Sequence, residues 1–133
     1  MPPVSKSPKR SRGETTRRAV LGDAHVDRAQ AATTPFDAPF QAFITDAAWD
    51  QLWSREDWSK RDRSIVTIAL LAALGHHDEL AMHIRATART GATEADVREA
   101  LLHVVVYAGV PAANTAIRIA KQVFAEMKAG KAE

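Results

Sequence analysis

The stretch that decides the fold is RDRSIVTIALLAALGHHDELAMHIRATARTGAT, residues 61–93. Its first half, residues 61–74, is apolar almost all round, which predicts a central, buried helix that ends at Gly75. Its second half, residues 77–90, has apolar residues at helical spacing among charged ones and ends at Gly91. The stretch therefore predicts two consecutive helices joined by a short turn.

Helical patterns continue on the C-terminal side of this stretch. Thr93 and Asp96 form a shortened capping box, which predicts the start of a helix that stops near Gly109. Pro111 suits the first turn of a last helix, because its missing N–H has no intrahelical partner there. That last helix is expected to end near Lys128.

The N-terminal side predicts shorter elements. In order, we expect a helix over 14–21, a connection over 23–35, a helix over 36–43, a helix capped by Asp46 and a loop over 54–60. Aromatic residues recur at helical spacing here, and we expect them in the core: Phe36, Phe40, Phe43, Trp49 and Trp53. His103 and Tyr107, four residues apart on an apolar helix, are also expected to be core residues.

These elements together predict an all-α protein with about six or seven helices in a single domain. We expect the domain to span residues 14–128, between a disordered basic tail over 1–13 and a short C-terminal tail over 129–133. Two of the helices are apolar on more than one face. One small subunit cannot cover both faces, so we expect a homo-oligomer.

Composition excludes several classes of function. The chain of 133 residues has no cysteine, which excludes disulfides and thiol nucleophiles. Its longest apolar run, residues 65–74, is well short of the roughly 20 residues that a membrane helix needs. Residues 1–18 carry a net charge of +5 and the rest of the chain −3, with no basic stripe in the body. We therefore expect a cytoplasmic protein with no membrane or nucleic-acid partner.

The helix over 77–90 concentrates the groups best suited to chemistry. Glu79 and His83 are four residues apart, so they share one face and can touch. A carboxylate beside a histidine fixes its tautomer and raises its basicity, which makes the pair a minimal proton-transfer unit. The same spacing also fits an ordinary ion pair on an exposed helix face.

Arg61 and Arg63 stand at the start of the apolar helix, where the helix dipole disfavours cations. This position fits either solvent-exposed charge or a bidentate clamp for a substrate carboxylate. Three imidazoles and a carboxylate lie within residues 76–83, but His77 and His83 fall on different helix faces and H-E-x-x-H is absent. We therefore expect no metal site.

Four segments resemble the 4-carboxymuconolactone decarboxylase family. They are RRAVLGDAHVDRA at 17–29, FQAFITDAAWDQLW at 40–53, the stretch 61–93 quoted above, and AGVPAANTAIRIA at 108–120. The resemblance implies an all-helical subunit of the alkylhydroperoxidase D-like type, assembled into trimers or hexamers. The peroxidase branch of that superfamily has a C-x-x-C-x-x-x-H motif, whose histidine falls on His83 and whose cysteines fall on His76 and Glu79. Peroxide chemistry is therefore not expected here.

The resemblance also implies an activity. It is the cofactor-independent decarboxylation of 4-carboxymuconolactone, a lactone with two carboxylates, to the β-ketoadipate enol-lactone in protocatechuate catabolism. Glu79 and His83 are implied as the catalytic pair, with no metal and no other cofactor. Substrate-binding roles are implied for Arg61, Arg63, Arg85 and His25.

Two alternatives fit the same residues. The first is a decarboxylase or isomerase of a related carboxylated lactone, because the apolar walls of the pocket cannot be identified from the sequence. The second is a non-catalytic helical oligomer that only binds ligands or partners. An assay of a panel of lactones tests the first alternative. Absence of carbon dioxide release from the authentic lactone by the folded protein favours the second.

Overall fold

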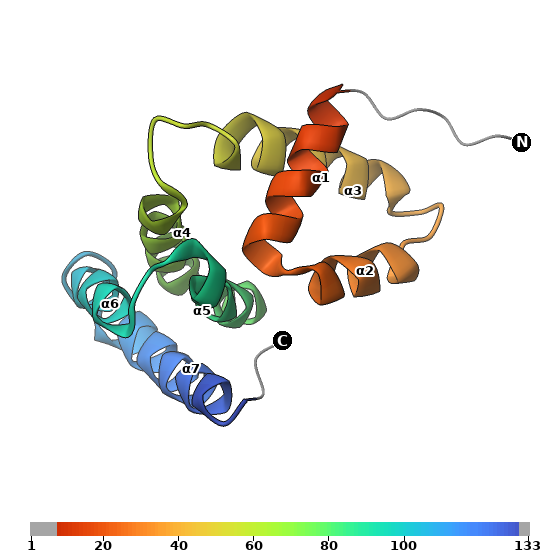
Figure 1. The fold of residues 1–133 in the computed structure, drawn as a ribbon. Coiled ribbons are helices and arrows are strands. Elements are labelled where there is room, and N and C mark those ends of the chain that lie inside the picture. The colour runs from red at the N-terminus through yellow and green to blue at the C-terminus, as the bar shows by residue number, and fades with distance from the viewer. Residues whose placement is uncertain (1–7, 131–133) are drawn as a thin grey trace, which may run out of the picture. The chain divides into compact units, whose positions relative to one another are not determined.

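The computed structural model describes residues 8–130, which form seven α-helices and one π-helical segment. No strand occurs among these residues, so the all-α prediction is confirmed. The chain divides into two compact helical units, one up to Trp58 and one from Ser59 onward (Figure 1). None of the described helices is long and apolar enough to cross a membrane.

In the N-terminal unit, helix α1 (Pro8–Leu21) packs along the π-helix η1 (Thr45–Trp53). Helices α2 (Asp23–Ala32) and α3 (Ala38–Ile44) connect the two (Figure 1). Gly13 permits the close approach of α1 to η1, because a Cβ there would overlap the carbonyl oxygen of Thr45. Trp49 and Trp53 are buried with ring centroids 5.4 Å apart, which confirms that both belong to the core.

Two arginine–carboxylate pairs tie α1 to η1. Arg10 binds both carboxylate oxygens of Asp46, at 2.8 and 2.9 Å, and Arg12 binds Asp50, with one bond of 3.0 Å. Asp50 is only 4% exposed, and a buried carboxylate needs such a cation because its charge has lost water. These arginines lie in the stretch that the sequence assigned to the tail. Helix α1 begins at Pro8 rather than Glu14, and residues 1–7 lie outside the described residues.

Three other predictions for this unit are wrong. Most of the expected connection over 23–35 is helix α2. Asp46 lies inside the first turn of η1, whereas Ile44 occupies the cap position. The phenylalanine face is exposed rather than buried, at 94% for Phe36, 59% for Phe40 and 71% for Phe43. Helical spacing predicts that these rings share a face, but it does not determine whether a neighbouring helix covers that face.

The C-terminal unit consists of α4 (Lys60–Leu74), α5 (His77–Thr90), α6 (Glu94–Ala108) and α7 (Val110–Lys128). These bounds agree with the prediction to within one residue. The four helices share one apolar core, which includes Ile68, Leu80, Ile84, Val97, Leu101, Val104, Ala113, Ala116, Ala120 and Val123.

Local signals set the ends of these helices. Gly75 and Gly91 end α4 and α5 with φ values of 75° and 88°, a left-handed conformation that glycine adopts without a Cβ penalty. Thr93 and Asp96 form the predicted reciprocal capping box: the Asp96 N–H donates to the Thr93 hydroxyl at 3.0 Å, and the Thr93 N–H donates to Asp96 at 2.9 Å. The register of α5 and α6 is therefore fixed by short-range sequence signals.

Two burial predictions for the C-terminal unit are corrected. Helix α4 is buried on one face only, because Leu70 and Leu74 on another face are 56% and 67% exposed. Tyr107 is 84% exposed and stacks on His103, with ring centroids 6.3 Å apart, so neither is a core residue. Apolar composition alone does not distinguish a face that packs within the chain from one that does not.

Candidate active site

His83 is the candidate acid or base, and it lies in the middle of α5. Its side chain is only 7% exposed, next to the fully buried core residues Leu80 and Ile84. Its position well inside α5 means that the imidazole is held by a helix rather than a loop. A buried imidazole on a rigid helix is suited to a single proton transfer at a defined point.

Glu79 lies one turn before His83 on the same helix face, as its spacing predicts. Its side chain is exposed, and among residues 8–130 no hydrogen bond joins it to His83. The expected contact is therefore not made in this structure. Residues four apart lie on one face of a helix, so the contact requires at least a change in the side-chain torsions of Glu79.

The two arginines at the start of α4 have different environments. Arg63 is only 8% exposed, whereas Arg61 is exposed. Arg61 makes a bidentate pair with Asp96 at the start of α6, with N···O distances of 2.9 and 2.7 Å. Hydrogen bonds from Arg61 and then from the Thr93 backbone lower the pKa of Asp96 to about 2. The anion that Arg61 binds in this structure is therefore a side chain of the same unit.

Arg85 and His25 are the other two predicted ligand-binding residues. Arg85 is half-buried on α5 and forms an ion pair with Glu126 of α7. His25 is half-buried on α2 and belongs to the N-terminal unit. The other predicted residues, Arg61, Arg63, Glu79, His83 and Arg85, belong to the C-terminal unit.

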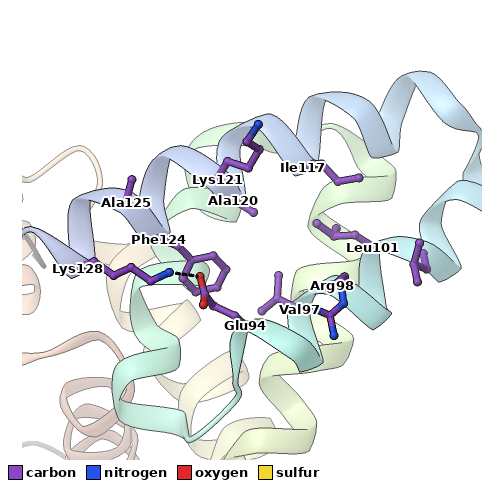
Figure 2. Close-up of a pocket in the computed structure, with 11 residues that line it drawn as sticks. Glu94, Val97, Arg98, Leu101, Ile117, Ala120, Lys121, Phe124, Ala125 and Lys128 are labelled. Carbon is purple, nitrogen blue, oxygen red and sulfur yellow. Dashed lines mark ion pairs between the residues drawn. The ribbon is translucent and has the colours of Figure 1, made fainter.

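A groove of about 640 Å³ lies elsewhere in the C-terminal unit, between α6 and α7. Figure 2 shows Val97 and Phe124 on its walls and an ion pair between Glu94 and Lys128 at one end, 3.1 Å long. None of the predicted site residues lines this groove. This groove was not identified from the sequence, because a groove and a packed core have the same sequence pattern.

The fold and these side chains define an all-helical protein that has a buried histidine on α5 and no cysteine in its sequence. The chain belongs to the carboxymuconolactone decarboxylase family, whose sequence profile matches residues 38–122.

Two relatives extend the similarity beyond the profile. The chain is 44% identical over 115 residues to a 4-carboxymuconolactone decarboxylase of Acinetobacter baylyi, covering 86% of each chain. It is 35% identical over 115 residues to a nitrosuccinic acid decarboxylase of Metarhizium robertsii, covering 86% of this chain and 80% of that protein. Both relatives are named as decarboxylases.

Proposed function

We propose that this protein is a carboxy-lyase that decarboxylates 4-carboxymuconolactone to the enol-lactone of β-ketoadipate. The 44% identity over most of both chains to a protein named for that activity is the observation that carries the proposal. The cysteine-free chain and the buried His83 are consistent with acid–base chemistry rather than thiol chemistry.

The substrate's own structure explains how the reaction runs. The departing carboxylate sits on a carbon that is conjugated through a C=C bond to the lactone carbonyl. When the bond to CO₂ breaks, its electron pair flows onto the carbonyl oxygen and gives a dienolate. Protonation of the carbon next to the carbonyl then yields the enol-lactone. The substrate is thus its own electron sink, and the protein supplies orientation, charge stabilisation and a proton.

We assign these roles to residues of the C-terminal unit. His83 delivers the proton or stabilises the dienolate oxygen, and Glu79 orients it after a side-chain rotation. Arg63, which is buried, and Arg85, which is half-buried, hold the retained carboxylate. Arg61 and His25 have secondary binding roles. Arg61 must leave Asp96, and Arg85 must leave Glu126, to contact substrate.

An ultraviolet assay of lactone consumption tests these roles. His83→Ala and Glu79→Gln are each expected to lower turnover by about 10²-fold or more. His77→Ala is the matched control, because His77 lies exposed at the start of the same helix. If both site variants fold and turn over at the wild-type rate, the assignment is wrong.

A second candidate substrate follows from the Metarhizium robertsii relative. That protein is named for nitrosuccinic acid, so a decarboxylase of a different carboxylated substrate also fits this family. Carbon dioxide release from the lactone and from nitrosuccinic acid, measured side by side, distinguishes the two. We expect the lactone to be preferred because its named decarboxylase is the more similar of the two relatives, at 44% against 35% identity.

The assembly is also a proposal. Leu70, Leu74 and Val106 of the C-terminal unit are 56%, 67% and 74% exposed, and such surfaces are typical of subunit contacts. We expect a homo-oligomer, a trimer or hexamer by family resemblance, and analytical ultracentrifugation measures it directly. The cytoplasmic location stays a prediction, which fractionation of the source cells checks.

A further inference from the structure

Arg17 of α1 is a buried arginine that the proposed reaction does not use. Its side chain is only 8% exposed, and burial lowers the pKa of its guanidinium below the ordinary value. Its Nη1 donates a hydrogen bond of 3.3 Å to the side-chain oxygen of Gln41, in the middle of α3. Its Nε is buried and forms no hydrogen bond with any residue among 8–130. A buried guanidinium with an unused donor is costly unless an anion or another acceptor approaches it.

Arg17 lines a pocket of about 250 Å³ in the N-terminal unit, together with Gln41, Thr45 and other mostly polar residues. The pocket is formed by residues 10–45 and shares no residue with the candidate active site. Gln41 accepts from Arg17 through its oxygen, so its amide N–H₂ group remains as a donor beside the guanidinium. Two adjacent donor groups of this kind match the two oxygens of a carboxylate.

The other charged groups of the pocket already have partners. Arg10 makes a bidentate pair with Asp46. Glu14 accepts a hydrogen bond of 3.0 Å from Gln30 and lies 3.7 Å from Arg18. Arg17 forms no hydrogen bond with Glu14, although the Glu14 charge partly offsets the effect of burial on its pKa. The guanidinium of Arg17 is therefore the cation best placed to bind an added anion.

We propose that this pocket binds one carboxylate of a small organic acid, with Arg17 as the charged ligand and the Gln41 amide as the second donor. The inference is independent of the proposed decarboxylation, because binding is measured without turnover. Two sources of the carboxylate share this chemistry, namely the substrate itself and a separate organic acid.

Succinate is the probe, titrated into the full-length protein by calorimetry and by ¹H–¹⁵N NMR. We expect a Kd of about 1 mM or below, as for one well-placed charge-assisted contact. The Gln41 side-chain amide signals are expected to shift, and the neutral analogue succinamide is expected not to bind. The proposal is overturned if no binding is detected at succinate concentrations up to 20-fold above that Kd. It is also overturned if the signal shifts are confined to the C-terminal unit.

Two variants are expected to change the affinity for succinate in opposite directions. Arg17→Gln is expected to weaken succinate binding at least about 10-fold, whereas Glu14→Gln is expected to strengthen it a few-fold by removing a nearby negative charge. Equal affinity of Arg17→Gln and wild type contradicts the proposal, as does weaker binding by Glu14→Gln. If Arg17→Gln does not fold, Gln41→Leu replaces it, with an expected loss of about 3-fold or more.

The remaining arm separates the two sources of carboxylate. If succinate competes with the lactone and raises KM at unchanged kcat, the pocket binds a carboxylate of the substrate. If succinate shifts the Gln41 amide signals but leaves KM unchanged, the pocket binds a separate organic acid. Arg85→Gln is the matched control, since it removes an arginine of the candidate active site and is expected to leave the Gln41 signal shifts in place.

Discussion

Replacement of Gly13 by alanine tests how closely α1 approaches η1. Two effects oppose each other in this variant. Alanine is the better helix former, which on its own stabilises a helix interior by about 1 kcal/mol. The new Cβ, however, overlaps the Thr45 carbonyl oxygen and lies 3.2 Å from the Cβ and the backbone N of Asp50. Two of these three atoms are backbone, so neither can rotate away.

Relief of the overlap requires α1 and η1 to move apart by several tenths of an ångström. Overpacking of this kind costs about 1–3 kcal/mol. Because the obstacle here is backbone, we expect a cost toward the upper end of that range. After subtraction of the propensity gain, Gly13→Ala is expected to lower the free energy of unfolding by about 1–2 kcal/mol.

Urea denaturation followed by circular dichroism, at one fixed protein concentration, measures this difference. Ser11→Ala is the control, because Ser11 is exposed on the same helix and its replacement is expected to stabilise by at most about 0.5 kcal/mol. If Gly13→Ala is as stable as Ser11→Ala, the close approach is not what selects glycine at this position.

Three further predictions concern the C-terminal unit. Leu80→Ala removes a fully buried side chain and is expected to cost about 3–4 kcal/mol in urea denaturation, against less than about 1 kcal/mol for the exposed Leu74→Ala at a concentration where the protein is monomeric. The pKa of Asp96 is lowered to about 2, so its ion pair with Arg61 stabilises the fold above pH 4 and loses that effect as the pH falls from about 4 to 2. In Arg61→Gln, the free energy of unfolding is therefore expected to change less between about pH 4 and pH 2 than in the wild type. Decarboxylation is expected to survive EDTA, and loss of activity that added Zn²⁺ or Mg²⁺ restores would instead reveal a metal requirement.

The helices of the C-terminal unit could be predicted closely from the sequence because their limits depend on neighbouring residues. Gly75 and Gly91 end two of them, and the Thr93–Asp96 box starts a third. The start of α1 could not be predicted in this way. Residues 8–13 are basic and polar, and they join the fold through Asp46 and Asp50, which lie 36 and 38 residues further along the chain. Such long-range pairing leaves no periodic signal.

In the candidate site too, the sequence predicts local features but not long-range contacts. Spacing correctly places Glu79 and His83 on one helix, but it does not determine the side-chain torsions that decide whether they touch. It also does not reveal that Arg61 binds Asp96, 35 residues away. Arg17 was part of a segment that carried the family resemblance, yet its burial depends on packing that only the structure describes.

The pairing of Arg12 with Asp50 limits how the protein can be shortened. A version that starts at Gly13 keeps every residue that was expected to be helical, yet it lacks the guanidinium that neutralises a carboxylate with 4% exposure. A shortened version made for crystallisation or for fusion at this end should therefore retain the chain from Pro8 onward.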